Sequence, residues 1–333
     1  MKTTHMALII LVIIFLSSIA FVFLTSPPSP PVPKEPLTIA SGSPEFSALT
    51  LVAEKKGFFT KNGLNVTVKD YSTGTAAINE LLEGRADMAC AAEFVGVATS
   101  FRSSDLKIIT TTAKSDVIAL VIRTDRTISK PADLKGKTIA VPKGTAAEFF
   151  LGRYLALHGM DIHDVTVRYL NPAELSESVE RGDSDAAIIW EPYVYQIAQK
   201  LSQNGTTWPA QSGQRFYWVT YTRPDVIRDR PGMFRQYLRA LTEAETYLYA
   251  HEPEAKALFK QRVNMSDAYI DTLWQKNRYG LSLDQGLILA MEDEARWMAE
   301  QNMTGGKIPP SYLDMIYQDP MREVKPSAVT IIR

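Results

Sequence analysis

The residues best suited to bind a ligand lie in the turn Lys143, Gly144 and Thr145, which follows a short apolar run at 138–141. Glu148 stands three residues after Thr145, a spacing typical of a capping box at a helix start. A strand that ends in a glycine turn and a capped helix exposes backbone N–H groups and the positive end of the helix dipole. Such groups can bind an anion. One turn of this kind is also compatible with an ordinary strand-to-helix connection.

The same order of elements recurs along the chain. The apolar runs at 37–41, 64–69, 87–91 and 185–189 are each followed by a short loop and then by a helical pattern. Repeated strand–loop–helix units predict parallel sheets whose loops gather at the carboxyl ends of the strands, where α/β folds bind ligands.

These strand-end loops are predicted to line one cleft. The candidate ligand-binding residues are Ser43, Glu45, Gly74, Thr75, Glu93, Phe94, Ser115, Asp116, Lys143, Gly144, Thr145, Trp190 and Glu191. Purely structural roles stay open for several of them. Glu93 and Glu191 stand at helix starts, where a carboxylate also stabilises the helix dipole. Trp190 is equally compatible with a core position, and Asp116 with a solvated turn.

Composition excludes several classes of function. The 333 residues are enough for two domains, and the net charge of −1 gives no support for a nucleic-acid partner. The single cysteine, Cys90, excludes an internal disulfide framework, and the four histidines lack zinc-ligand spacing. No nucleophile–base pair is evident, so we expect no catalytic residue, no metal and no cofactor.

The N-terminus predicts export. Residues 6–24 are apolar apart from Ser17 and Ser18, and as a helix they would be about 28 Å long, close to the thickness of a bilayer core. Segment 1–24 is therefore predicted to be a signal peptide or a membrane anchor. Residues 25–36 contain six prolines and predict an extended linker.

The remaining chain predicts two α/β lobes. Lobe 1 is expected to comprise 37–124 and 216–333, with lobe 2, 125–215, inserted between them, and helical patterns predict a helical C-terminal extension. The runs at 105–112 and 117–123 are predicted to be adjacent strands, with the first crossing between lobes at 125–132. Two crossings make a hinge, and hinged lobes often close around a ligand.

The sequence resembles the extracytoplasmic substrate-binding proteins of ABC importers, in the nitrate, aliphatic sulfonate, taurine and thiamine-pyrimidine group. The residues that carry the resemblance are Ala53-Glu-Lys-Lys-Gly-Phe-Phe59, Leu81-Leu-Glu-Gly-Arg-Ala-Asp87, Asp133-Leu-Lys-Gly-Lys137, Lys143-Gly-Thr145 and Trp190-Glu-Pro-Tyr193. The resemblance implies a two-lobed periplasmic-binding-protein type II fold, a monomer, and delivery of a small solute to an ABC permease with its ATPase.

Binding without catalysis is therefore the leading hypothesis. The alternative of another class is a pyrimidine-synthesising enzyme; relatives of that kind use a cysteine-rich motif and pyridoxal phosphate. For the solute, Lys143 and the helix starts favour an anion such as a sulfonate. The carboxylates favour an ammonium or ring N–H, so a zwitterion such as taurine satisfies both signs. Nitrate, or a thiamine-pyrimidine precursor stacked on Trp190 or Phe94, remains open.

Overall fold

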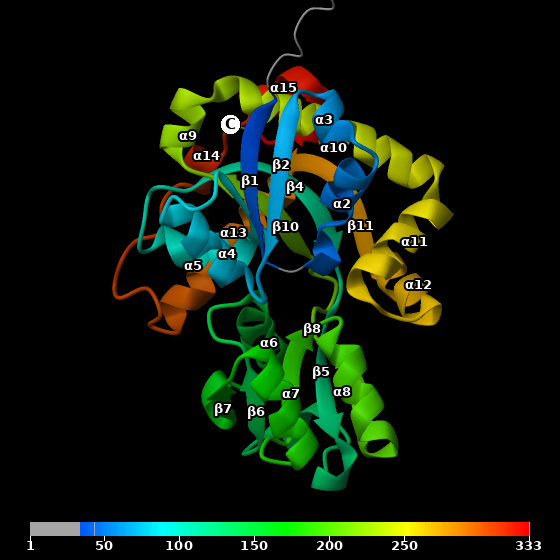
Figure 1. The fold of residues 1–333 in the computed structure, drawn as a ribbon. Coiled ribbons are helices and arrows are strands. Elements are labelled where there is room, and N and C mark those ends of the chain that lie inside the picture. The colour runs from blue at the N-terminus through cyan, green and yellow to red at the C-terminus, as the bar shows by residue number, and fades with distance from the viewer. Residues whose placement is uncertain (1–33, 43, 333) are drawn as a thin grey trace, which may run out of the picture. The chain divides into compact units, whose positions relative to one another are not determined.

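The computed structural model describes residues 34–42 and 44–332. Residues from Lys34 onward form one compact unit, and the predicted export segment and most of the linker lie outside the described residues. Within this unit the strands form two separate sheets, one in each of two lobes (Figure 1). Among the described residues, no helix has both the length and the hydropathy needed to cross a bilayer.

Lobe 1 is built on a mixed seven-stranded sheet. Its strands, in spatial order, are β12 (Val329–Thr330), β11 (Asn277–Asp284), β4 (Lys107–Ser115), β10 (Phe216–Thr222), β3 (Met88–Ala92), β1 (Glu35–Ser41) and β2 (Leu64–Asp70). Strand β1 is parallel to both β2 and β3, whereas β10 runs antiparallel between β3 and β4. The carboxyl ends of β1, β2 and β3 therefore point toward lobe 2 (Figure 1).

Helices cover both faces of this sheet. One group comprises α2 (Ala48–Lys55), α3 (Phe58–Lys61), α10 (Pro231–Ala250), α11 (Glu252–Val263) and α12 (Asp267–Lys276). The other side holds α4 (Gly74–Leu82), α5 (Glu93–Ser100), α13 (Gln285–Glu300) and α14 (Tyr312–Met315), while α9 (Pro224–Asp229) and α15 (Asp319–Val324) lie at the far end (Figure 1). Because both faces are covered, β3 is buried at every position, which its small apolar residues permit.

Lobe 2 has a five-stranded sheet and three longer helices. The strand order is β7 (Thr166–Tyr169), β6 (Thr138–Val141), β8 (Ala186–Trp190), β5 (Ile118–Arg123) and β9 (Gly205–Pro209). The helices are α6 (Ala146–Leu157), α7 (Pro172–Arg181) and α8 (Tyr193–Leu201). Local signals fix α7 in particular: Asn171 caps its N-terminus reciprocally with Glu174, and Gly182 ends it in the left-handed conformation.

The structure differs from the sequence prediction at the first crossing between lobes. Strand β5 pairs with β8 and β9 in the sheet of lobe 2, so it is not the neighbour of β4 that we expected. The chain crosses at 116–117, between β4 and β5, and not at 125–132. The segment 113–116 between the two runs was expected to be a polar turn that joins adjacent strands, but polar residues cannot distinguish a hairpin from a crossing. The sequence analysis did not predict strands β9 and β11.

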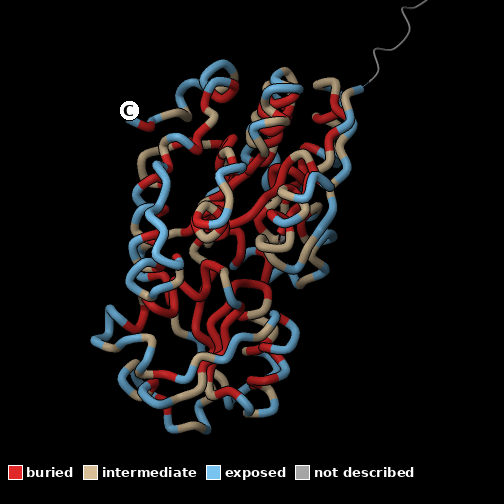
Figure 2. The backbone as a smooth tube through the Cα atoms, turned by 90° about the vertical axis from the view of Figure 1, so that its left-hand side faces the viewer, coloured by how far each residue is buried: buried red, intermediate tan, exposed pale blue. Residues whose placement is uncertain are grey.

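Buried residues run continuously from one lobe to the other (Figure 2). Phe94 of α5, Phe149 of α6 and Trp297 of α13 form an interlobe aromatic cluster, with ring centroids 5.6–6.1 Å apart. At Gly152, an added Cβ would stand 2.5 Å from the indole Nε1 of Trp297, so only glycine allows α6 and α13 to approach this closely. The lobes are thus packed against each other in a closed arrangement.

Candidate functional site

A small cavity with a volume of about 30 Å³ lies where the two lobes meet. Its lining is apolar and strongly aromatic, and it comes from both lobes. Lobe 1 contributes Phe46, Gly74, Ala92, Val95, Phe216 and Trp218, and lobe 2 contributes Ile118, Thr145, Ala146 and Trp190. A solute held here would contact both sheets, and its binding would stabilise the closed arrangement.

Three aromatic residues of lobe 1 form one wall. Phe46 belongs to the short 3₁₀ turn η1 (Pro44–Phe46) that follows β1, and Phe216 and Trp218 lie two residues apart on β10. The ring centroid of Phe46 is 5.0 Å from that of Phe216, edge-on, and 4.9 Å from that of Trp218. Positions two apart on a strand share a face, which is why both β10 rings reach the same cavity.

Two indole N–H groups are the distinctive polar feature of the lining. Trp190 and Trp218 are 7% and 3% exposed, and the Nε1 atom of each is buried without a hydrogen-bond partner among the described residues. An unpaired buried donor costs about 1–3 kcal/mol. The two residues come from opposite lobes and both belong to the lining of one cavity, so an acceptor bound between the lobes is a candidate partner for these donors.

Two helix starts add backbone donors. Helix α4 begins at Gly74, where an added Cβ would stand 2.7 Å from the Cβ of Ala91, so glycine is required for this approach. Helix α6 begins at Ala146, and its N-cap residue Thr145 makes no side-chain cap. The Thr145 hydroxyl donates instead to the Pro142 carbonyl at 2.7 Å. The Glu148 N–H donates to the Thr145 carbonyl at 3.0 Å, so of the first-turn N–H groups of α6 those of Ala146 and Ala147 remain available to an acceptor.

The predicted anion-binding turn is arranged differently from our expectation. The capping box is incomplete, because the Glu148 carboxylate accepts hydrogen bonds from the Gly144 N–H and the Tyr169 hydroxyl, each at 2.6 Å. The Lys143 side chain is exposed, with its ammonium 5.2 Å from the centre of the Tyr169 ring. Gly144 has φ +68°, and an added Cβ would meet nothing within 4 Å. Of this turn, only Thr145 belongs to the cavity lining.

The other predicted residues of lobe 1 divide between the cavity and its surroundings. Gly74 is on the lining, and the Thr75 hydroxyl donates to the Gly144 carbonyl at 3.2 Å, a direct link between lobes. Phe94 is fully buried in the interlobe aromatic cluster and is not on the lining. Ser43 lies outside the described residues.

The predicted carboxylates do not line the cavity. Glu45 precedes the lining residue Phe46, and burial raises the pKa of its carboxyl to about 7. Glu93 is fully buried at the start of α5, and burial raises its pKa to about 8. Glu294 of α13 is equally buried; burial, reinforced by Glu93, raises its pKa well above the usual range. A neutral carboxyl cannot neutralise an ammonium.

Ser115, Asp116 and Glu191 lie at the hinge. The Ser115 hydroxyl donates to the side-chain oxygen of Asn277, inside lobe 1. Asp116 and Glu191 line a separate hollow beside the crossing. There, the Lys276 ammonium of lobe 1 lies 3.3 Å from the Glu191 carboxylate of lobe 2, an ion pair that joins the lobes. Of the thirteen predicted residues, the cavity lining therefore contains Gly74, Thr145 and Trp190.

Sequence reasoning missed most of the aromatic wall. Phe216 and Trp218 stand in the aromatic run 216–221, which is typical of a strand. Nothing local indicated that these two side chains would face lobe 2. In the part of the chain that the structure describes, no three His, Cys, Asp or Glu side chains come together as a possible metal site.

Comparison with known proteins gives concordant matches. The profile of the family described as "NMT1/THI5 like" matches residues 44–255. The chain is 24% identical to the taurine-binding periplasmic protein of Escherichia coli (strain K12) over 280 residues, covering 78% of this chain and 83% of that protein. It is 25% identical over 232 residues to a Bacillus subtilis (strain 168) protein named for binding aliphatic sulfonates, covering 67% and 69%.

Solved structures confirm the predicted fold. The alkanesulfonate-binding protein SsuA from Xanthomonas axonopodis pv. citri, bound to MOPS, superimposes with a TM-score of 0.74 at 18% identity, covering 86% of this chain and 99% of that one. The periplasmic aliphatic sulphonate binding protein SsuA from Escherichia coli gives 0.73 at 18% identity, covering 86% and 98%. The desulfurization enzyme DSZB is also similar, with a TM-score of 0.62 at 15% identity, covering 88% and 99%. At these identities the likeness establishes the fold alone.

Proposed function

The chain belongs to the NMT1/THI5-like family, and we propose on that premise that it is the extracytoplasmic solute-binding protein of an ABC importer. Its solute is an organic sulfonate with an apolar body, held between the lobes and delivered to a permease. The protein acts by binding, without turnover. Relatives named for binding aliphatic sulfonates and taurine, one of them periplasmic, support both the class of solute and the location.

The observation that carries the proposal is the pair of unpartnered indole N–H groups of Trp190 and Trp218 in an otherwise apolar cavity. An anionic oxygen accepts strong hydrogen bonds from such donors. The backbone N–H groups at the helix starts, Gly74 and Ala146, are further hydrogen-bond donors that favour an anion. The aromatic wall around Phe46 would pack against an alkyl or aryl group.

The chemistry of the cavity lining also distinguishes between the alternative solutes. None of the described residues on the lining is charged, so the ammonium of taurine would be buried there without a counter-charge. Nitrate is too small to use the aromatic wall. A thiamine-pyrimidine precursor would stack on the rings, but it offers no anionic oxygen to the indole donors. We therefore place an apolar sulfonate ahead of these three.

The test is calorimetric titration of the purified full chain in a neutral detergent. Benzenesulfonate and 1-hexanesulfonate are compared with taurine, nitrate and a 4-aminopyrimidine, and benzenesulfonamide is the uncharged control of matched shape. We expect the two apolar sulfonates to bind at least tenfold more tightly than taurine and benzenesulfonamide, a difference of about 1.4 kcal/mol. Equal affinity for benzenesulfonate and benzenesulfonamide would reject the anion site. If the aminopyrimidine binds most tightly, the solute is a thiamine-pyrimidine precursor and not a sulfonate.

A further inference from the structure

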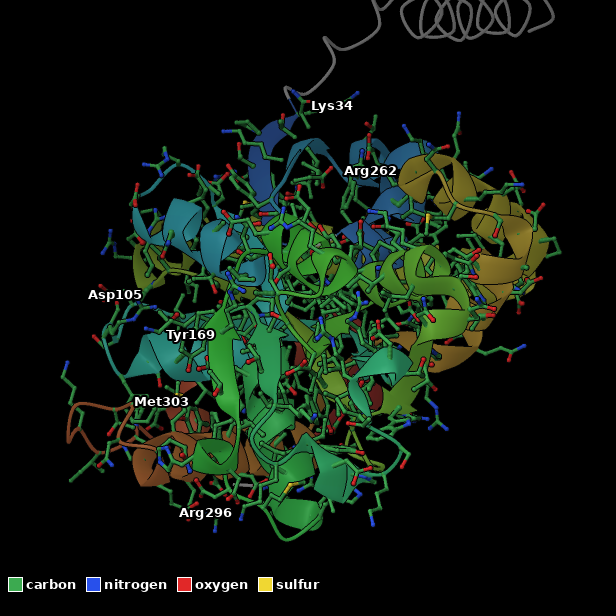
Figure 3. The ribbon with its side chains drawn as sticks, turned by 90° about the horizontal axis from the view of Figure 1, so that it is seen from below. Lys34, Asp105, Tyr169, Arg262, Arg296 and Met303 are labelled. Carbon is green, nitrogen blue, oxygen red and sulfur yellow. The ribbon has the colours of Figure 1, made fainter. Side chains whose placement is uncertain are left out.

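A second, larger hollow lies on the flank of the molecule, outside the solute cavity. It has a volume of about 630 Å³ and is open to solvent. Five cationic side chains line it, and we call it the basic cleft: Lys114, Arg153, Arg215, Arg278 and Arg296. Asp293 is the one acidic residue among its described lining residues. Figure 3 labels Arg296 on this flank, well away from Arg262.

The sheet of lobe 1 brings two of these cations together. Lys114 of β4 and Arg278 of β11 are directly opposite each other in an antiparallel pair. Their side chains therefore leave the same face of the sheet, with Cβ atoms roughly 5 Å apart, where like charges destabilise the pair. The Lys114 ammonium is compensated, because it lies 2.6 Å from the Asp284 carboxylate and 5.0 Å from the centre of the Tyr217 ring. Arg278 has no such compensation.

The contact between the lobes places two further cationic side chains, Arg153 and Arg296, in the basic cleft. Arg153 follows Gly152, whose close approach to Trp297 holds α6 against α13, and Arg296 precedes Trp297. Arg296 pairs with Asp293 at 3.8 Å, but both side chains are largely exposed, so this pair is weak. The Nε of Arg153 is buried and has no hydrogen-bond partner in the part of the chain that the structure describes. The closed arrangement thus adds positive charge from lobe 2 to the face that carries Arg278.

Three guanidinium groups remain without a counter-charge. Among the described residues, Arg153, Arg215 and Arg278 make no ion pair within 4.0 Å. They come from three separate segments: α6, the return crossing before β10, and β11. An arginine side chain stays charged at any physiological pH and presents a planar fork of donors that matches phosphate and sulfate groups.

We propose that the basic cleft binds a polyanion that carries two or more phosphate- or sulfate-type groups. Three uncompensated guanidinium groups call for more than one negative charge, and the hollow is larger than a single tetrahedral anion needs. The solute cavity has a different chemistry, since no charged side chain is among its described lining residues. The groups could come from a free polyanion or from phosphates displayed by anionic lipid headgroups.

Tripolyphosphate is the probe, titrated by calorimetry into the full chain in dodecyl maltoside at low ionic strength. We expect binding that weakens at least tenfold in the double variant Arg153→Gln/Arg278→Gln. Arg102→Gln is the matched control, because Arg102 is exposed in lobe 1 and is not on the cleft lining; it should leave the affinity unchanged. Arg278→Lys keeps the charge but loses the fork, and should give an intermediate affinity. Raising the salt should weaken binding to the parent more than to the double variant.

A second arm distinguishes the two sources of phosphate. Phosphatidylglycerol added to the micelles should compete with tripolyphosphate in the parent if headgroups occupy the cleft, and should have no effect if only free polyanions do. If the double variant fails to fold, as judged by its melting curve, Arg215→Gln alone replaces it. The proposal is overturned if the parent does not bind tripolyphosphate, or if parent and variants bind it equally. It is also overturned if poly-L-glutamate shows the arginine dependence and tripolyphosphate does not.

Discussion

Replacing the two cavity tryptophans by phenylalanine distinguishes their effect on solute affinity from their effect on the stability of the fold. Trp190→Phe and Trp218→Phe each keep an aromatic ring in the wall but remove an indole N–H that is buried without a partner. In the free protein that donor is a cost of about 1–3 kcal/mol, so its removal offsets the area lost with the smaller ring. We therefore expect the melting temperature without solute to change little in either variant.

The effect on binding should be large. A hydrogen bond to a charged acceptor contributes about 1.5–3 kcal/mol, so losing one donor should weaken sulfonate binding roughly 10- to 150-fold. If both indoles bind the same sulfonate group, the double variant should lose less than the sum of the single losses, because neighbouring donors couple. Affinity for benzenesulfonamide, which lacks the charge, should fall much less.

The assay is calorimetric titration of benzenesulfonate, with a thermal melt of each variant without solute. Trp208→Phe is the matched control, because Trp208 lies on β9 and is not on the cavity lining. The reasoning is refuted if both cavity variants bind benzenesulfonate like the parent. It is also refuted if affinity and free-protein stability fall together by similar free energies, since the rings would then be structural only.

Four further predictions test the lobes around the cavity. Gly74→Ala should destabilise the protein by about 1–3 kcal/mol in chemical denaturation, because its Cβ would stand 2.7 Å from that of Ala91; Gly232→Ala, with open space at the Cβ, is the control. The pKa of Glu93 is about 8 in the folded state and about 4.3 in the unfolded state. The stability that the protonated carboxyl contributes should therefore be complete below about pH 4 and lost as the pH rises through 8. Glu93→Gln should flatten the plot of unfolding free energy against pH in this range, and an unchanged plot would contradict this. A chain that begins at Lys34 should fold as a soluble monomer, which sedimentation tests. A chain that begins at Leu37 should have a lower melting temperature, because it lacks Glu35, which pairs with Arg230 at 2.8 Å. His158→Ala, at the exposed end of α6, should leave solute affinity unchanged, and a loss above threefold would show that our placement of the cavity is wrong.

The two-lobed α/β architecture and the region of the cavity could be predicted from the sequence. Strand–loop–helix order is encoded locally, by runs of apolar residues followed by glycine turns and helix starts. Segments such as Met88–Ala92 and Ala186–Trp190 could therefore be predicted as buried parallel strands. The turns that precede α4 and α6 were predicted to line one cleft, and the lining includes Gly74 from the first and Thr145 from the second.

Which side chains face that cavity depends on packing between segments that are far apart in the sequence. Glu93, Phe94 and Glu191 stand beside lining residues in the sequence, yet they lie behind the wall or at the hinge, because packing between lobes sets their direction. The assignment of β5 to lobe 2 likewise depends on pairing with strands about 70 and 85 residues further along the chain. Contacts at that separation leave no local pattern. The sequence could place helix starts at one edge, but only the packed lobes brought the indoles of Trp190 and Trp218 to the same cavity.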